Sequence, residues 1–135
     1  MMKLALILVP ALALLFASCA TPPPKRYAMV TGLKPEKEAY YRKLHAAPWP
    51  SVMAKLRECH IRNYSIHRIE IAGRPYLIGY FEYVGDDFEA DMEKMAADPE
   101  TQRWWKETDP CQRPLPEALR KGEIWTTAEE VFYTP

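Results

Sequence analysis

The fold is decided by residues 61–84, which read IRNYSIHRIEIAGRPYLIGYFEYV. Two stretches within it, Ile61–Ile71 and Pro75–Val84, are rich in β-branched and aromatic residues, and Ala72-Gly73-Arg74 separates them. Such residues favour extended chain, and a short connection containing glycine favours a tight turn. We therefore expect a β-hairpin in the middle of the chain, with the other elements arranged around it.

The segments before this hairpin predict one strand and an interrupted helix. The strand is expected at Tyr27–Leu33, and a helix opens at Pro35, where a missing N–H costs nothing, and runs to about His45. Pro48 and Pro50 must break it. Helical spacing then resumes in an apolar stripe that we expect to face the core: Val52, Met53, Leu56 and Cys59.

The segments after the hairpin repeat the pattern of helix followed by strand. Gly85-Asp86-Asp87 predicts a turn and a helix cap, and Asp98-Pro99-Glu100 starts a further helix. A proline-rich loop follows, and Ile124–Tyr133 is expected to be the last strand. The order β-α-β-β-α-β predicts an α+β, ferredoxin-like fold. Helices would cover one sheet face, and a second copy would cover the other in a dimeric α+β barrel.

Length and charge restrict the kinds of partner. The chain has 135 residues, enough for one domain. Lysine plus arginine equal aspartate plus glutamate, 18 against 18. Because the surface is neutral overall, we expect no nucleic acid as partner.

The N-terminal residues resemble an export signal rather than part of the fold. An apolar run from Leu4 to Ala17 follows Lys3 and ends at Ser18-Cys19, a pattern typical of bacterial lipoproteins. We expect a signal peptide at 1–18, lipidation of Cys19, and a proline-rich tether at 19–25 before a domain at 26–135. The protein would then be a lipid-anchored lipoprotein of the cell envelope, facing the periplasm or in the outer membrane. An uncleaved anchor or an ordinary secretory signal is the alternative.

Two cysteines remain in the expected domain. An oxidising compartment permits a bridge between Cys59 and Cys111. Their separation in space cannot be read from the sequence, so a disulfide and two buried thiols both stay open.

Tyr41 and His45 are candidates for proton transfer. They are four residues apart, so they share one helix face, just before the break at Pro48. A phenol beside an imidazole suits acid–base chemistry near neutral pH. A single pair at this spacing is more often structural than catalytic.

The first strand of the hairpin has a polar side and an apolar side. Asn63, Ser65 and His67 share one side, and either point to water or line a polar pocket, while Tyr64 and Ile66 point into the core.

Two adjacent tryptophans follow on the next helix. Trp104 and Trp105 cannot both face the core. We expect one of them to be buried and the other to form a pocket wall or a dimer contact, although both could simply pack. Cys59, His60 and His67 lack the spacing of a zinc site, so we predict no metal, and no other cofactor.

Four motifs, taken together, resemble the L-rhamnose mutarotase family. They cover essentially the whole expected domain in the family's order: YYRKLHAAPWP at 40–50, IRNYSI at 61–66, QRWW at 102–105 and EEVFY at 129–133. The resemblance implies a dimeric α+β barrel and an isomerase that interconverts α and β anomers of L-rhamnose or a related monosaccharide without a cofactor.

The resemblance also assigns roles within the site. It implies that His45 is the acid–base residue, that Tyr41 stands beside it, and that Trp104 and Trp105 wall the sugar site, with Asn63 available for the sugar hydroxyls. Ala46-Ala47 replaces an Asn-Pro of the family, Ser51 an acidic residue, and residues 108–122 form a longer loop. The alternatives are a non-catalytic sugar-binding lipoprotein with the same pocket and a monooxygenase-type enzyme on the same barrel.

Overall fold

The computed structural model describes residues 22–135. Its strands and helices follow one another as β1 (Lys25–Leu33), the 3-10 helix η1 (Pro35–Lys37), α1 (Glu38–Ala46), α2 (Pro50–Glu58), β2 (Ile61–Ile71), β3 (Arg74–Tyr83), α3 (Phe88–Ala97), α4 (Pro99–Thr108), the 3-10 helix η2 (Asp109–Cys111), β4 (Gln112–Arg113), α5 (Pro116–Lys121) and β5 (Thr126–Ala128). The expected signal peptide, 1–18, and Cys19 lie outside these residues. No helix between residues 22 and 135 has the length and apolar character that crossing a membrane requires.

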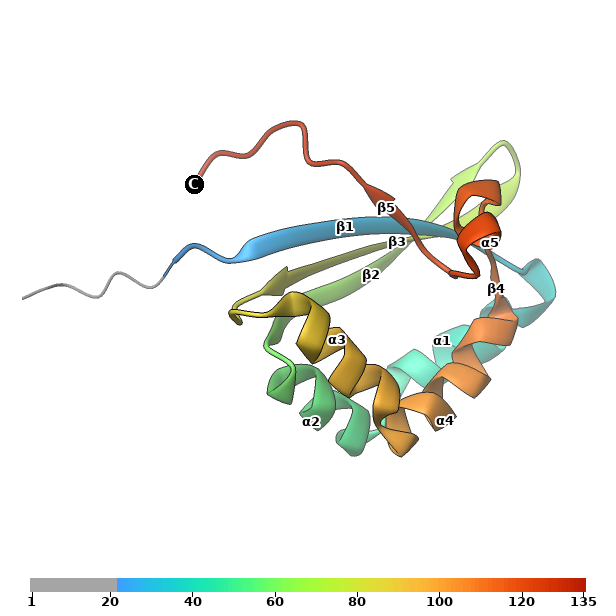
Figure 1. The fold of residues 1–135 in the computed structure, drawn as a ribbon. Coiled ribbons are helices and arrows are strands. Elements are labelled where there is room, and N and C mark those ends of the chain that lie inside the picture. The colour runs from blue at the N-terminus through green and yellow to red at the C-terminus, as the bar shows by residue number, and fades with distance from the viewer. Residues whose placement is uncertain (1–21) are drawn as a thin grey trace, which may run out of the picture.

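The strands form one antiparallel sheet in the order β2-β3-β1-β4, and β5 pairs with β1 further along. Helices α1 to α4 lie together on one face of this sheet, and the C-terminal segment passes on the side away from them (Figure 1). This is the predicted ferredoxin-like α+β arrangement, and the fold class is confirmed. Because β3 and β1 are central in the sheet, the helices pack against the side chains on the inner faces of these two strands.

The central hairpin has the predicted tight turn. Ala72 and Gly73 both have positive φ, 49° and 72°, and they join Ile71 directly to its partner Arg74. Two such residues make the turn that matches the twist of antiparallel strands. At the other end of the hairpin the register shifts between Arg62 and Ser65, a β-bulge.

Side-chain caps start two of the helices where the sequence predicted them. Asp87 accepts a hydrogen bond from the Ala90 amide at 3.1 Å, and Asp98 accepts one from the Thr101 amide at 2.9 Å. The first predicted helix begins differently. Residues from Pro35 form only a 3-10 turn, and the α-helix starts at Glu38.

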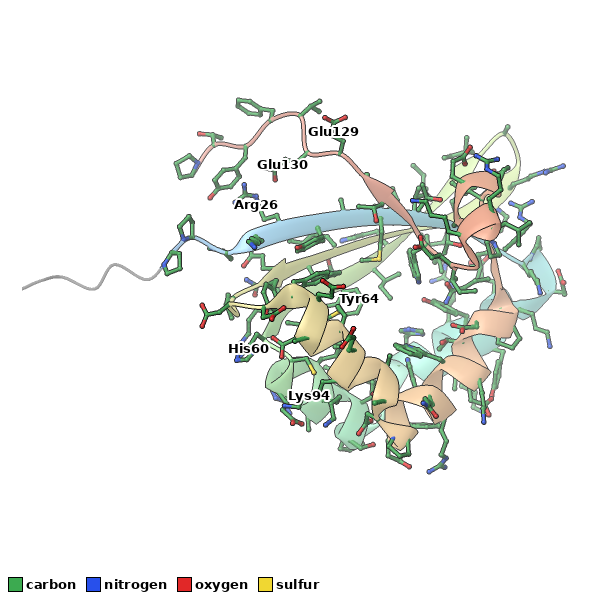
Figure 2. All side chains as sticks on the ribbon, viewed as in Figure 1. Arg26, His60, Tyr64, Lys94, Glu129 and Glu130 are labelled. Carbon is green, nitrogen blue, oxygen red and sulfur yellow. The ribbon has the colours of Figure 1, made fainter. Side chains whose placement is uncertain are left out.

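The last strand is shorter than predicted. The expected strand Ile124–Tyr133 is only β5, Thr126–Ala128, and the chain beyond it is held by side chains instead of ladder hydrogen bonds. Arg26 of β1 donates two hydrogen bonds to Glu130, at 2.7 and 2.8 Å, and its guanidinium lies 3.2 Å from the ring centroid of Tyr133. Figure 2 shows Arg26 and Glu130 pointing toward one another.

Two separate core clusters lie under the sheet. One is built on five residues, Cys59, Ile61, Phe81, Tyr83 and Met95, and the other on four, Leu33, Tyr41, Leu77 and Cys111. Cys59 and Cys111 are therefore two buried free thiols in different clusters, the second of the two possibilities that the sequence left open. Met53, which we expected to face the core with the rest of its stripe, is 38% exposed, so that part of the prediction is wrong.

Candidate functional site

A cavity of about 530 Å³ lies between the inner face of the sheet and the helices, a volume typical of small-molecule sites. It adjoins a second hollow of about 330 Å³. Residues common to both are His45, Leu56, Tyr64, Ile66, Met95, Trp104 and Trp105. Because Tyr41 also lines the larger one, the fold brings four of the five candidates for the site together: Tyr41, His45, Trp104 and Trp105.

His45 is held in one tautomer by the backbone of its own helix. Its Nδ1 lies 2.9 Å from the carbonyl oxygen of Tyr41, one turn earlier. A carbonyl can only accept, so Nδ1 carries the proton and Nε2 of the neutral ring has a free lone pair. Burial lowers the pKa of His45, an effect that the hydrogen bond to the Tyr41 carbonyl partly offsets. The residue is therefore biased toward the neutral form, a base.

Tyr41 supports the imidazole from one side. The two rings stack with centroids 4.1 Å apart, as the spacing of four predicts. Tyr41 is only 4% exposed, and burial raises the pKa of its phenol far above the ordinary value. Its hydroxyl therefore stays protonated and can donate a hydrogen bond.

The two adjacent tryptophans divide their roles as the sequence predicted. Trp104 is 7% exposed and meets both His45 and Trp49 edge-on, each at 5.3 Å between ring centroids. Trp105 is 37% exposed, and both indoles line the cavity. Trp104 therefore packs edge-on against the imidazole, and Trp105 offers an accessible wall.

Tyr64 was not among the predicted site residues, although it lines both hollows. Figure 2 places it between the sheet and the helices. Burial raises the pKa of its phenol to about 12, while 40% of the residue remains accessible, which we attribute to the open side of the cavity. The alternation of β2 did direct Tyr64 inward. The sequence pattern did not indicate that the interior next to Tyr64 contains a cavity.

Asn63, predicted to bind sugar hydroxyls, is not brought to the cavity. It lies in the bulge with a φ of 49°, and its side chain donates a 2.7 Å hydrogen bond to Glu82. His67 and Ser65 bond to each other at 3.1 Å, and His67 is exposed. The polar side of β2 therefore faces outward and does not line a pocket, one of the two possibilities that the sequence left open.

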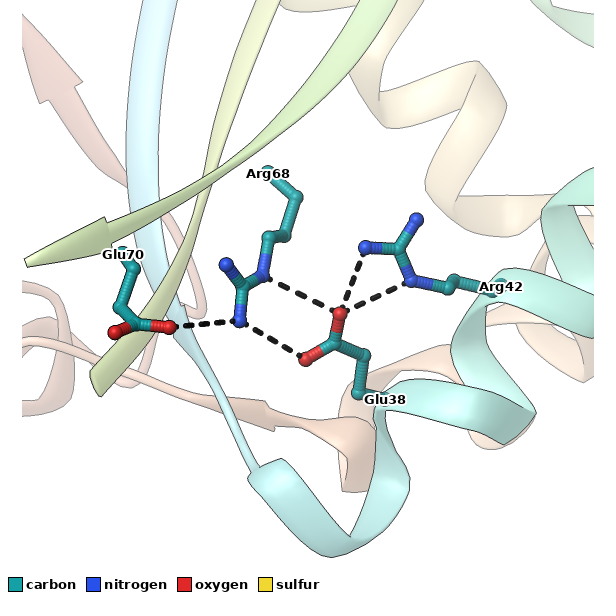
Figure 3. Close-up of polar contacts among 4 residues, drawn as sticks. All are labelled: Glu38, Arg42, Arg68 and Glu70. Atoms are coloured by element: carbon teal, nitrogen blue, oxygen red, sulfur yellow. Dashed lines mark hydrogen bonds and ion pairs between the residues drawn. The ribbon is translucent and has the colours of Figure 1, made fainter. Parts of the chain in front are cut away.

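A network of charges joins the helix that carries His45 to the sheet. Glu38 of α1 accepts hydrogen bonds from Arg42, at 2.7 and 3.0 Å, and from Arg68 of β2 at 3.4 Å (Figure 3). Arg42 and Arg68 also line a third hollow, of about 280 Å³, together with Tyr41 and His45. The hydrogen bond from Arg42, followed by the effect of Arg68, lowers the pKa of Glu38.

These features describe a site for proton transfer on a small molecule with apolar and hydroxyl surfaces. It combines an imidazole with a free nitrogen, two protonated phenols and two indole walls. Among residues 22–135, no three His, Cys, Asp or Glu side chains gather in a group that could hold a metal ion.

Known proteins with similar sequences agree on one family. The family model of L-rhamnose mutarotase matches residues 26–134. An L-rhamnose mutarotase of Mesorhizobium japonicum is 33% identical over 68% of this chain and 89% of its own length. One from Oceanobacillus iheyensis is 32% identical over 81% of this chain and 97% of its own.

Solved structures agree on the fold. The crystal structure of an L-rhamnose mutarotase from Formosa agariphila superposes with a TM-score of 0.62 at 21% identity, covering 82% of this chain and 99% of that one. A tetracenomycin F2 cyclase from Streptomyces glaucescens gives 0.56 at 15% identity, with the same coverage. At these identities the structures show a shared fold only, whereas the family model matches residues 26–134 in sequence. The chain belongs to the L-rhamnose mutarotase family.

Proposed function

We propose that this protein is a sugar mutarotase that interconverts the α and β anomers of L-rhamnose or a related monosaccharide in the cavity around His45. The observation that carries the proposal is the geometry of the imidazole. Its Nδ1 is committed to the Tyr41 carbonyl, and its Nε2 is left free beside a cavity that a monosaccharide can enter. Membership of the family supplies the substrate class.

Mutarotation requires two proton transfers and no net change in the sugar. Nε2 of His45 accepts the proton of the anomeric hydroxyl while the bond between C1 and the ring oxygen breaks and that oxygen gains a proton. The open aldehyde then rotates about C1–C2, and the reverse steps close the ring on the other face. A positioned proton-transfer group typically accelerates such a step by about 10²–10⁴-fold.

The remaining cavity residues hold the sugar. The indoles of Trp104 and Trp105 present apolar surface to the C–H face of the ring, and the phenols of Tyr41 and Tyr64 donate to its hydroxyls. These contacts restrict the sugar to poses in which the anomeric centre lies near His45.

Exchange NMR tests this function directly. The rate of α–β interconversion of L-rhamnose, L-fucose and related sugars is measured with and without protein, and the uncatalysed rate is subtracted. We expect at least one sugar to equilibrate faster with the protein. Saturable binding by calorimetry without faster exchange would replace the enzyme with the sugar-binding alternative.

We further propose that the protein works as a lipoprotein of the cell envelope, with a signal peptide at 1–18 and a lipid on Cys19. The family match begins only at residue 26, so the apolar run and the cysteine are additional to the mutarotase domain. Cys19→Ser is expected to move the protein from the membrane fraction to the soluble fraction. An unchanged distribution, or no acyl chain detected by mass spectrometry, would contradict the anchor.

A homodimer is the assembly that we propose. The sheet face away from the helices exposes apolar side chains, with Ile69 at 41% and Ile78 at 38%. A second copy placed on that face would bury them and complete a barrel. Light scattering of the domain 26–135 is expected to give twice the monomer mass. Ile78→Glu, which places a charge on this face, is expected to restore the monomer.

A further inference from the structure

The mutarotase chemistry proposed above needs a second proton-transfer group, because His45 can serve only one of the two oxygens at a time. The neutral imidazole acts as base, so its partner must act as acid. Tyr41 and Tyr64 are weak candidates, since burial raises the pKa of both phenols well above the ordinary value. The acidic lining residues of the larger cavity are Asp109 and Glu123, and Glu123 is exposed to solvent.

We propose that Asp109 is this second proton-transfer residue, exchanging a proton with the ring oxygen of the sugar while His45 exchanges one with the anomeric hydroxyl. Asp109 is the first residue of η2, which packs against α1, the helix of His45. It lines the cavity together with Tyr41 and His45, and it lies close enough to Tyr41 for its charge to raise the pKa of that phenol.

The surroundings of Asp109 shift its carboxyl toward the protonated form. It is half-buried at the C-terminal end of α4, where the helix dipole opposes a negative charge. Burial raises its pKa, and no cation of residues 22–135 counteracts that effect. The Thr108 hydroxyl, which donates to the Trp104 carbonyl at 3.3 Å, lies beside the carboxyl and offsets part of it. Burial thus favours the neutral form of both partners, imidazole base and carboxylic acid.

A neighbouring side chain indicates that a ligand binds at this end of the cavity. Gln112, three residues after Asp109, lines the same cavity, is 4% exposed, and has a buried Oε1 that receives no hydrogen bond from residues 22–135. Buried acceptors are rarely left unpaired. A sugar hydroxyl beside Asp109 would supply the missing donor after a small adjustment of the amide. The acid and the amide are therefore two polar groups of the cavity lining that a sugar hydroxyl can contact together.

The titratable groups around Asp109 are few. Those lining the cavity are Tyr41 and His45 from α1, Tyr64 from β2 and Glu123 before β5. At the other end of η2, burial raises the pKa of the Cys111 thiol, and Lys37, Lys34 and Glu107 also affect this pKa. Lys34 is engaged with the Pro110 carbonyl at 2.9 Å, and Glu107 accepts from the Tyr40 hydroxyl. The pH dependence of catalysis should therefore follow His45 on the acid side and Asp109 on the alkaline side.

The test compares Asp109→Asn with Asp86→Asn, a matched change at an exposed aspartate in the turn before α3. For Asp109→Asn we expect kcat for anomer exchange to fall about 100-fold, KM to change little, and the alkaline fall of the pH profile to disappear. Asp86→Asn should behave as the wild type. A normal kcat and pH profile in Asp109→Asn would overturn the assignment, whereas an inactive wild type would instead overturn the proposed function.

A second measurement does not depend on the variant folding. The side-chain carboxyl of Asp109 can be titrated in the wild-type protein by carbon NMR. We expect the Asp109 carboxyl to titrate above the ordinary aspartate range of about 4. A midpoint at or below that range would leave no acid form available and would refute the assignment.

Discussion

The described part of the molecule contains two histidine–tyrosine pairs that have the same composition but differ in their ring geometry, their hydrogen-bond partners and their access to a cavity. His45 stacks on Tyr41 at 4.1 Å, and His60 meets Tyr83 edge-on at 6.3 Å. Both histidines engage Nδ1, at 2.9 Å to the Tyr41 carbonyl and at 2.8 Å to the Asp91 carboxylate. The Tyr83 hydroxyl donates to the same carboxylate at 2.7 Å.

The surroundings decide what each pair can do. His60 is exposed over 48% of its side chain, and neither His60 nor Tyr83 lines any of the three hollows described above. The hydrogen bonds from Tyr83 and His60 lower the pKa of Asp91, so the ionised form of this carboxylate is favoured. Within the described part of the chain His45 has no carboxylate partner, and it borders all three hollows. A free ring nitrogen becomes useful only where a substrate can reach it.

The largest expected difference between the pairs is in catalysis. His45→Ala removes the proposed base, so we expect the catalysed rate of α–β exchange to fall by about 10²–10⁴-fold. His60→Ala, the matched change in the other pair, should leave the rate close to that of the wild type. Exchange NMR at saturating sugar measures both. Equal losses in the two variants would show that folding, and not proton transfer, explains the effect of His45.

A second comparison separates packing from substrate contact within the site. Trp104 is 7% exposed and Trp105 is 37% exposed. Trp104→Ala leaves a cavity against His45 and Trp49, and we expect it to lower the free energy of unfolding by about 3–5 kcal/mol. Trp105→Ala should cost much less stability but raise KM. Urea unfolding together with sugar titration distinguishes them, and a reversed order of stability would show that Trp105 is the structural indole.

The other pair can be disturbed without touching the site. A Cβ at Gly85 would lie 2.6 Å from Cζ of the Tyr83 ring and 2.9 Å from Cγ of His60, and it would overlap the Tyr83 hydroxyl. Tyr83 is 1% exposed and has little room to move. Gly85→Ala should therefore lower the free energy of unfolding by about 1–3 kcal/mol and leave exchange activity intact. A loss of activity at unchanged stability would couple the two regions.

Stability as a function of pH gives a smaller difference. Because burial lowers the pKa of His45 below its unfolded value of about 6.5, the unfolded chain binds the proton more readily. His45 therefore contributes stability above about pH 6.5, and that contribution is lost as pH falls through its folded pKa. We expect urea midpoints of the wild type to decline over this window, and those of His45→Gln to decline less. Parallel curves would show that folding leaves the pKa of His45 unchanged.

The features that sequence reasoning predicted correctly are those set by local chemistry. The caps Asp87 and Asp98 lie where short acceptors precede helical spacing, and a separation of four residues stacks Tyr41 on His45. Alternation directed Tyr64 inward. Such rules operate over one or two turns of chain, so one sequence is sufficient to apply them.

The features that it missed depend on distant parts of the chain. The bulge turns Asn63 toward Glu82, and a single-residue shift of this kind exchanges the two sides of a strand. The final strand ends at Ala128, and the chain after it is held by Arg26, about 100 residues earlier. Asp109 joins the cavity only because η2 packs on α1. No local pattern in the sequence predicts these contacts.

The smallest effect is expected at the charged network beside the site, and it tests whether that network only positions α1. Glu38→Gln keeps the shape of Glu38 and removes its charge, so its bonds to Arg42 and Arg68 weaken. Exposed ion pairs contribute little to stability, so thermal unfolding should match that of Glu117→Gln, a control in the separate pair with Arg120. Exchange activity should fall less than about fivefold, because His45 keeps its bond to the Tyr41 carbonyl within the same helix. A loss as large as that of His45→Ala would mean that the network takes part in proton transfer, and the distinction between the site and its support would have to be redrawn.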